Sequence, residues 1–496
     1  MKQIDSHGKP YNRFLVMSVM MLAAIAGSLM QTSLGTALPT LMKAFDINLS
    51  TAQQATTWFL LANGIMVPIS AYLANNFSTK WLHVSAYIML LVGVVLTVMT
   101  PQNADSWWIF VLGRVITGIG VGIILPLMQI VILNMYKEHE RAGAMGMMGL
   151  VVGMAPAFGP TLTGLILEKK HIIFGMTLSN DWTSIFVAPL LFIILAVVLS
   201  PFTIKDIIPM KKTHLDILSL CLSTIGFGLF LFGFTNVSSQ GWDDFISVIG
   251  PIVSGIVMLV LFAFRQTKLE VPFLDIRVFL HKDFTVPTLL VLFATMAMYG
   301  VEMMLPTYLQ NIRGLTPLDS GLALMWGALI MGLVSPIVGK LYNKVGIKRL
   351  SFVGFGLLTL GTIPFLYLTA ETPQLIITIL YALRMIGVAT VLMPLTTSAM
   401  SALPKKQLSD GTAANNTIRQ ISSSIVVALL TSIVQNVINT NKPSSSLKHS
   451  DPLLYISKTL DASMDGFISA FTISLGFAII GIVLIFCLNS KKETVK

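Results

Sequence analysis

The sequence predicts an all-α polytopic membrane protein. Of its 496 residues, 54% are hydrophobic and 11% are charged, whereas soluble domains carry about 25% charged residues. The mean hydropathy is +0.81. Fourteen apolar stretches of about 20 residues recur along the chain, each long enough to cross a hydrocarbon core about 30 Å thick. These observations exclude a soluble globular protein.

The predicted spans begin close to the amino terminus. The first follows Lys9 and Arg13, but it is too long for the core of a signal peptide, and no small-residue cleavage pattern closes it. The connection 439–465 is unusually long and leaves two interpretations open, a hairpin or short amphipathic element and a disordered tether. The spans are predicted at 14–37, 52–74, 82–99, 107–135, 142–167, 182–202, 215–235, 245–264, 284–309, 320–342, 350–369, 373–400, 412–438 and 466–488.

The net charge of +10 reflects the orientation of the chain in the membrane and does not indicate a polyanionic partner. If the amino terminus is cytoplasmic, 21 of the 32 Lys and Arg residues lie in cytoplasmic segments, and the outer loops hold 7. The positive-inside rule therefore predicts that both termini are cytoplasmic. We expect no nucleic-acid partner.

A short internal repeat predicts two related halves. Ala71 to Lys80 follows the second span, and Gly339 to Lys348 follows the tenth span 268 residues later, with Leu, Asn and Lys in register. The predicted organisation is a six-helix half at 1–204, two inserted helices with their flanking loops at 205–283, and a second six-helix half at 284–496.

Motifs for fuel-driven or metal-dependent chemistry are absent from the sequence. It contains no G-x-x-x-x-G-K-[ST] loop and no H-E-x-x-H or Cys/His cluster. Cys221 and Cys487 lie in apolar runs and are predicted to be buried. A membrane protein with a repeat and no such site is typical of secondary transporters, so we expect no enzyme activity, metal or cofactor.

Glu302 is the one acidic residue, of 22, that lies well inside a predicted span. Desolvation favours the protonated form of a carboxyl group, so Glu302 could take up and release a proton during transport. The alternative is a static ion pair with Arg114, Arg384 or Arg419, the arginines within predicted spans. We predict proton coupling through Glu302.

Polar and polarizable side chains at membrane depth must face protein or a water-filled cavity. On the thirteenth span, Asn416 and Gln420 are spaced one turn apart and fit either a cavity lining or an interhelical hydrogen-bond network. The predicted substrate cavity contains Gln31, Asn63, Met298, Tyr299, Trp326, Arg384, Asn416, Arg419 and Gln420.

Glycines recur at three- or four-residue spacing along one face of the fifth span. Small residues permit close helix contact, and proline removes a backbone hydrogen bond and bends a helix. The span therefore fits a tight interface that flexes, although packing without motion would select the same residues. The predicted conformational motif contains Gly149, Gly153, Pro156, Gly159, Pro160 and Gly164, together with Gly339, Asn343, Gly346 and Lys348 of the repeat.

These motifs resemble those of the fourteen-helix drug:proton antiporters of the major facilitator superfamily, the EmrB/QacA type. The likeness covers nearly the whole chain. It is carried by Arg114-Val-Ile-Thr-Gly118-Ile-Gly120 on the fourth span, Gly149 to Gly164 on the fifth, Tyr308-Leu-Gln-Asn-Ile-Arg-Gly314, Gly339 to Lys348, and Asn415-Asn-Thr-Ile-Arg-Gln420.

The resemblance implies a major facilitator fold in a bacterial cell membrane, with Arg114 assisting proton movement and a central cavity that binds hydrophobic, often cationic compounds for export. The sequence also departs from the family. Met30 occupies the position of a common acidic residue in the first span, and Asn75 and Asn343 replace the usual Asp of the loop motif. More of the coupling would therefore fall on Glu302.

The favoured hypothesis is a monomeric, proton-coupled exporter of amphipathic small molecules that works by alternating access. An alternative exporter on the same fold would carry anionic amphipaths such as lipids, bile acids or other organic acids, because three embedded arginines outnumber one carboxylate. A membrane-embedded sensor or scaffold without transport is a third class, but it would leave the two-half organisation unexplained.

Overall fold

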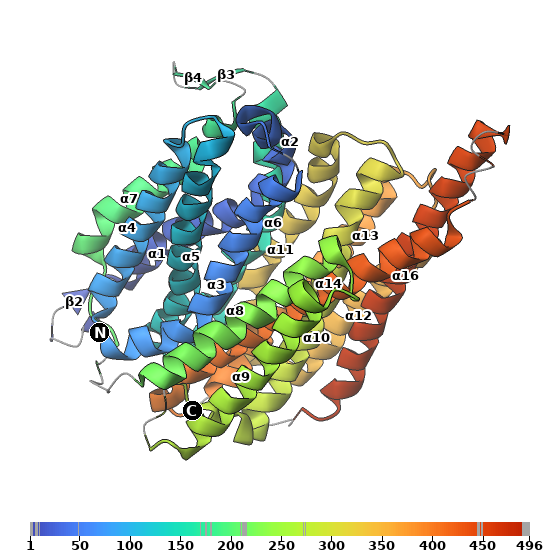
Figure 1. Cartoon of the computed structure of the whole chain (residues 1–496). Coiled ribbons are helices and arrows are strands. Elements are labelled where there is room, and N and C mark those ends of the chain that lie inside the picture. Colours follow the sequence, from blue (N-terminus) through green and yellow to red (C-terminus); the bar gives the residue numbers. More distant parts are fainter. Residues whose placement is uncertain are drawn as a thin grey trace.

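The computed structural model is built almost entirely of long helices (Figure 1). It describes residues 3–4, 8, 10–47, 49–168, 170–173, 176–178, 181–208, 210, 216–270, 272, 274–443, 447 and 450–488, with some side chains inside these ranges left out. The helices are α1 (Arg13–Thr32), α2 (Leu34–Phe45), α3 (Leu49–Asn76), α4 (Thr79–Val98), α5 (Trp107–Met135), α6 (Glu138–Glu168), α7 (Val187–Thr203), α8 (Ile217–Gln240), α9 (Gly250–Lys268), α10 (Lys282–Asn311), α11 (Pro317–Val345), α12 (Ile347–Thr362), α13 (Gln374–Ser401), α14 (Leu408–Asn441) and α16 (Pro452–Ile485).

Short elements connect or extend these helices. Two antiparallel two-stranded hairpins pair β1 (Gln3–Ile4) with β2 (Pro10–Tyr11) and β3 (His171–Ile173) with β4 (Met176–Leu178). The short helical turns are η1 (Ala104–Ser106), η2 (Trp182–Phe186), η3 (Phe245–Ile249), η4 (Ile276–Leu280), η5 (Ile363–Tyr367) and η6 (Lys405–Gln407).

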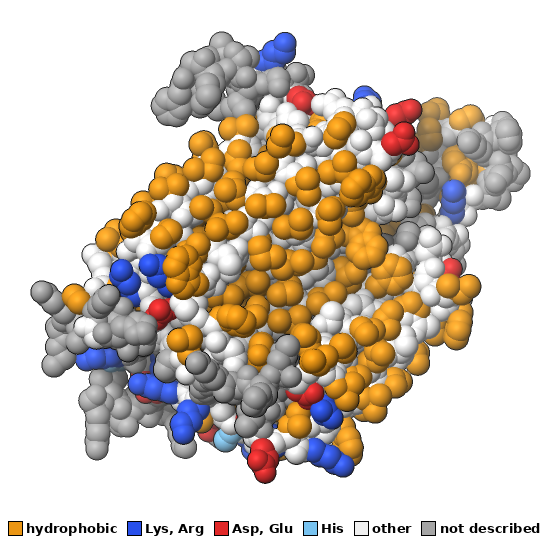
Figure 2. Space-filling model, turned by 60° about the vertical axis from the view of Figure 1, so that its left-hand side comes forward, with side chains coloured by type: hydrophobic (Ala, Val, Ile, Leu, Met, Phe, Trp, Pro, Cys, Tyr) orange, Lys and Arg blue, Asp and Glu red, His pale blue; other side chains and the backbone are white. Residues whose placement is uncertain are grey.

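Thirteen helical segments among the described residues are long and apolar enough to cross a membrane. Helix α6 has 31 residues and runs beside α11, but it includes 151–157, whose side chains lie outside the described residues. The chain is therefore a polytopic helical membrane protein, and a count of fourteen spans stays a prediction. Figure 2 shows hydrophobic side chains over the middle of one face and charged side chains gathered toward its ends.

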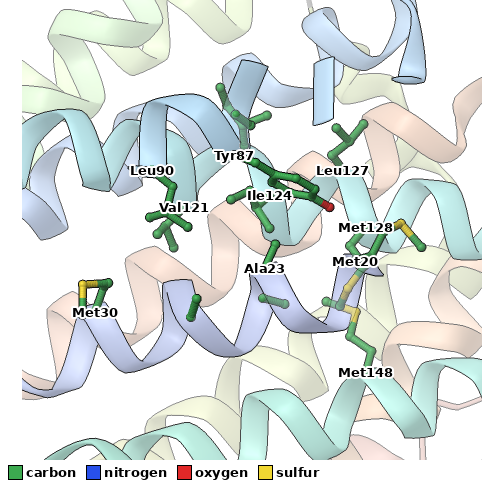
Figure 3. Packing of buried hydrophobic residues seen from close by; sticks show 14 of the residues in the cluster. Met20, Ala23, Met30, Tyr87, Leu90, Val121, Ile124, Leu127, Met128 and Met148 are labelled. Atoms are coloured by element: carbon green, nitrogen blue, oxygen red, sulfur yellow. The ribbon is translucent and has the colours of Figure 1, made fainter. Parts of the chain in front are cut away.

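The helices gather in two groups, α1 to α7 and α10 to α16 (Figure 1). One buried cluster is built mainly from the first group. The residues in Figure 3 show how α1, α4, α5 and α6 meet in it: Met20, Ala23, Met30, Tyr87, Leu90, Val121, Ile124, Leu127, Met128 and Met148. A second buried cluster is built from α10, α11, α12, α13, α14 and α16. Met393 and Met400 of α13 join the first cluster, so the groups share apolar contacts.

The two groups meet along two seams. Helix α6 packs on α11 at one seam, and α3 packs on α14 at the other. Helix α8 packs against both α3 and α14 and carries α9 on its outer side. Arg265 of α9 donates two hydrogen bonds to Asp216, which precedes α8, at 2.8 and 3.0 Å. These bonds lower the pKa of Asp216 to about 2, so the pair stays ionised at neutral pH. The ion pair joins the start of α8 to α9.

Two segments differ from the expectation, and a third is the connection for which two interpretations were open. The first predicted span is divided at Ser33 into α1 and α2, and the Ser33 hydroxyl donates to the Leu29 carbonyl, a local bond that competes with regular helix geometry. The long connection 439–465 is mostly helical, because α14 continues to Asn441 and α16 begins at Pro452. Cys221 and Cys487 are exposed rather than buried, since Cys221 lies on an exposed side of α8 and Cys487 lies in the turn after α16.

Candidate functional site

Glu302 lies where α10 faces α13. Tyr299 and Glu302 are one turn apart on α10, and Tyr381 and Arg384 are one turn apart on α13. Glu302 interacts electrostatically with Arg384 and with both tyrosines. Within the described residues it forms neither a hydrogen bond nor an ion pair, although it is largely enclosed by protein. The carboxyl group therefore has a cation nearby without being fixed to it.

Arg384 is completely buried and is held by neutral groups. Its Nε donates to the Thr362 hydroxyl at 2.8 Å, and its Nη2 donates to the Ala297 carbonyl at 2.8 Å. Its Nη1 has no partner among the described residues. An arginine stays protonated in proteins, so this positive charge is permanent.

Arg114 is held in the same way in the first group of helices. Its Nη2 donates to the Met30 carbonyl at 2.8 Å, its Nε donates to the Ala55 carbonyl at 3.4 Å, and its guanidinium lies 4.3 Å from the centre of the Phe59 ring. The carbonyl that accepts from Nη2 lies at a similar sequence separation in both cases: Met30 lies 84 residues before Arg114, and Ala297 lies 87 residues before Arg384. The two arginines are therefore held alike, since each donates from Nη2 to a backbone carbonyl of an earlier helix.

Helix α14 directs polar side chains toward three neighbouring helices. Asn415 donates to Thr288 of α10, and Asn416 donates to Gln129 of α5 at 2.9 Å. A side chain added at Gly64 of α3 would touch Leu231 of α8 and Gln420 of α14. The predicted hydrogen-bond network is thus present between α14 and its neighbours, and one of its bonds joins the two groups of helices.

The remaining predicted cavity residues do not form one cluster. Met298 is buried on α10, one residue before Tyr299, and Asn63 is buried on α3, where its backbone meets Gly122. Gln31 lies near the end of α1 and is partly buried. Trp326 lies on the exposed stripe of α11 with Leu333 and Ile337, opposite the side that packs on α6.

Close glycine contacts form the seam between α6 and α11. Gly149 faces Ser335 and Met393, Gly164 faces Leu318, and Gly339 faces the Ala142 carbonyl. The glycines do not share one face as expected, because Gly159 faces Thr32 of α1 instead. Pro160 lies on the same helix, whereas the side chains at Gly153 and Pro156 lie outside the described residues.

Gly146→Ala is expected to lower the free energy of unfolding by about 1–3 kcal/mol, because a methyl group there would lie 2.5 Å from the Ser335 carbonyl oxygen of α11 and force the helices apart. Thermal unfolding of the purified protein in detergent measures the change. Gly143→Ala is the matched control, since its added methyl group meets nothing within 4 Å. Equal unfolding temperatures for the two variants would contradict this account of the seam.

The repeat motif Gly339 to Lys348, which begins in the last turns of α11, forms a contact across the same seam. Asn343 donates to the His139 carbonyl in the first turn of α6 at 2.5 Å. Gly346 joins α11 to α12 with a φ of +80°, which glycine adopts without strain. Lys348 donates to the Leu488 carbonyl just beyond α16. The amide at position 343 donates a hydrogen bond that an ionised Asp could not make.

Asn343→Asp is expected to loosen this contact, because a carboxylate repels the His139 carbonyl. Loss of one neutral hydrogen bond, worth about 0.5–1.5 kcal/mol, would raise the equilibrium constant for separation of α11 from the start of α6 by about two- to twelvefold. Hydrogen exchange of the backbone amides at 137–141 measures it. Asn75→Asp is the control, since Asn75 makes no hydrogen bond in the described part of the chain. Unchanged exchange in Asn343→Asp would refute the contact.

Three residues of the site were not expected from the sequence. Gln129 is a buried amide in an otherwise apolar stretch of α5, and a search for lone polar residues in apolar spans would find it. Tyr381 lies one turn before Arg384 and could have been found by its spacing. Thr362 carries no such signal, because a threonine is common in apolar helices and only packing brings it to Arg384.

Comparison with known proteins identifies the family. The sequence profile of the Major Facilitator Superfamily matches residues 20–427. The chain belongs to this superfamily. It is 37% identical over 485 residues to the uncharacterised MFS-type transporter YcnB of Bacillus subtilis (strain 168), covering 98% of this chain and 97% of YcnB. It is 33% identical over 494 residues to the lincomycin resistance protein LmrB of the same organism, covering 99% of each chain.

Solved structures show the same fold. The crystal structure of the human organic anion transporter MFSD10 has a TM-score of 0.61 and 13% identity, covering 95% of this chain and 99% of that one. The expected major facilitator fold is thereby confirmed, and so is the expectation that the chain is a transporter rather than an enzyme. The superfamily member described here is a multi-pass membrane protein that acts on small molecules.

Proposed function

We propose that this major facilitator protein exports amphipathic hydrophobic small molecules, including drugs, in exchange for protons. Relatives that match at 33–35% identity are named lincomycin resistance proteins, which supports a drug as the exported compound. The observation that carries proton coupling is Glu302, an enclosed carboxyl group beside Arg384 that no ion pair fixes within the described residues. Such a group can change its protonation while the protein changes its conformation.

The proposed mechanism is alternating access between two six-helix halves, 1–204 and 284–496, with α8 and α9 as inserted helices. The close seams α6–α11 and α3–α14 support it, because they are the surfaces along which the groups would move. We place fourteen spans in a bacterial cell membrane with both termini cytoplasmic. The protein would act as a monomer.

Protonation of Glu302 would remove its attraction for Arg384 and change the charge at the meeting of α10 and α13. Arg114 would take the counterpart role on α5, where carbonyls instead of a carboxylate hold it. Release of the proton on the opposite side would restore the pair and reset the transporter. The proton gradient can drive the conformational change only through a group that binds and releases protons, and we propose that this group is Glu302.

Purified protein in liposomes with an acidic interior tests the proposal, since the oriented fraction that mimics export would accumulate lincomycin or ethidium inside. We expect accumulation that disappears when a protonophore collapses the gradient. Accumulation that is independent of the gradient would reject proton coupling. No accumulation of a range of neutral, cationic and anionic amphipaths would reject export.

A further inference from the structure

Arg419 is a second embedded cation whose charge the proton-coupling pair does not use. It lies on α14, and no hydrogen bond or ion pair joins it to any described residue; its Nε is buried without a partner. Its electrostatic partner is the Tyr299 hydroxyl. A permanent guanidinium charge at membrane depth, with unused donors, costs free energy unless an acceptor supplied from outside satisfies it.

The hydrogen bonds of α14 show where Arg419 points. Asn415 is directed at α10 through Thr288, and Asn416 is directed at α5 through Gln129. Successive helical residues differ by about 100° in direction, so Arg419 falls between those two directions, one turn further along. Its side chain is therefore directed at the region between α10 and α5, where the two groups of helices face each other.

Arg419 is also separated from Glu302 along the bundle. Helices α10 and α14 run side by side, with Thr288 bonded to Asn415 and Gly300 facing Leu430. Arg419 is about one turn beyond Asn415, whereas Glu302 is about four turns beyond Thr288, so their levels differ by roughly 15 Å. Tyr299 lies between them and interacts with both. Glu302 and Arg419, which carry opposite charges, therefore both interact with Tyr299.

The surroundings of Arg419 are partly exposed and are not part of the closely packed core. Arg419 and Tyr299 are only partly buried, as are Asn416 and Gln420 on the same helix, whereas Arg384 is completely buried. A ligand that reached Tyr299 could contact Arg419 without displacing a packed side chain. The guanidinium offers two parallel N–H donors, a geometry that matches a carboxylate, sulfonate or phosphate.

We propose that Arg419, with Tyr299, forms a subsite for the acidic group of the exported compound, so that the preferred substrates are amphipaths with an anionic head. This inference rests on the proposed export function and assigns its substrate class. Glu302 and Arg384 would handle the proton, and Arg419 would provide the counter-charge for the substrate. The apolar body of the substrate would lie beside the aromatic ring of Tyr299, which is partly exposed.

A matched pair of probes tests the subsite: dansyl-undecanoate, which is anionic, and its uncharged N-methylamide. Both are titrated at pH 8 into purified protein in phosphatidylcholine nanodiscs, with empty nanodiscs as the blank. We expect the wild type to bind the anion at least about tenfold more tightly than the amide, which is the effect of hydrogen bonds to a charged group. Arg419→Gln should abolish that preference and leave amide affinity within about twofold.

Arg349→Gln is the control with the same change of charge, since Arg349 is exposed at the start of α12. Arg419→Lys should retain a reduced preference, because it keeps the charge but loses the paired donors. If Arg419→Gln binds the anion as tightly as the wild type while still binding the amide, the subsite is refuted. A wild type with no preference for the anion refutes it equally.

Transport separates this proposal from the proposed function. Arg419→Gln that accumulates the amide in response to a pH gradient, but no longer prefers the anion, supports both. A wild type that accumulates neither probe counts against export, whatever the binding results. Anionic lipid is the other source of the same chemistry. If phosphatidylglycerol nanodiscs weaken binding of the anionic probe about tenfold more in the wild type than in Arg419→Gln, the subsite belongs to a lipid headgroup and the substrate assignment is overturned.

Discussion

Glu302→Gln is expected to abolish accumulation driven by a pH gradient while leaving the protein folded. The amide has nearly the shape of the protonated carboxyl group but cannot ionise, so the cycle loses the step in which Arg384 gains and loses its partner charge. Proteoliposomes with an acidic interior measure the effect as loss of dye accumulation. The variant should elute and unfold like the wild type.

Substrate counterflow without a gradient separates coupling from binding in the same variant. Because glutamine mimics the protonated state, exchange of labelled for unlabelled dye should continue at a rate close to that of the wild type. Glu371→Gln, in an exposed loop between η5 and α13, is the control for loss of one carboxylate. Gradient-driven accumulation that survives in Glu302→Gln would remove Glu302 from the mechanism, and loss of counterflow as well would make it a structural residue.

Chemical cross-linking between α5 and α14 is expected to stop transport almost completely. The bond from Asn416 to Gln129 joins the two groups of helices, so any movement between them must break it. In a background with Cys221→Ser and Cys487→Ser, a Gln129→Cys/Asn416→Cys pair treated with a short, reducible bifunctional thiol reagent should lose transport. Dithiothreitol should restore it.

The neighbouring residue provides the matched control for the cross-link. Asn415 bonds to Thr288 of α10, which belongs to the same group of helices as α14. A Thr288→Cys/Asn415→Cys pair treated in the same way should retain most of its transport, because those helices would move together. Transport that persists after full cross-linking of the 129–416 pair would be incompatible with movement at this seam.

Much of the architecture could be predicted from composition and local pattern. Helices that cross a membrane need an unbroken apolar stretch, because an unsatisfied backbone group is costly in lipid. That local requirement makes most spans recognisable one at a time, and the repeat of Gly339 to Lys348 pointed to related segments. The division at Ser33 was missed because a hydroxyl bonded to a carbonyl one turn away leaves the apolar pattern unchanged.

The partners of the embedded charges were much harder to predict. Arg114 and Arg384 stand out in the sequence because charged residues are rare in spans. Their acceptors are the carbonyls of Met30 and Ala297, and every residue carries a carbonyl, so no pattern marks those two. Trp326 also stood out in the sequence, because it is a tryptophan inside a predicted span. The opposite side of α11 packs on α6, so Trp326 lies on the exposed stripe of that helix.

Hydropathy and the sequence motifs were sufficient for the helical membrane class, the superfamily and the rare ionisable residues at membrane depth, because each depends on residues close together in the chain. Folding alone decided that Arg384 faces Glu302, that Asn343 reaches the first turn of α6, and that Arg419 is left without a described partner. These relations join helices far apart in sequence. They depend on how helices rotate and slide against one another, and hydrophobicity constrains that only weakly when lipid is as apolar as the core.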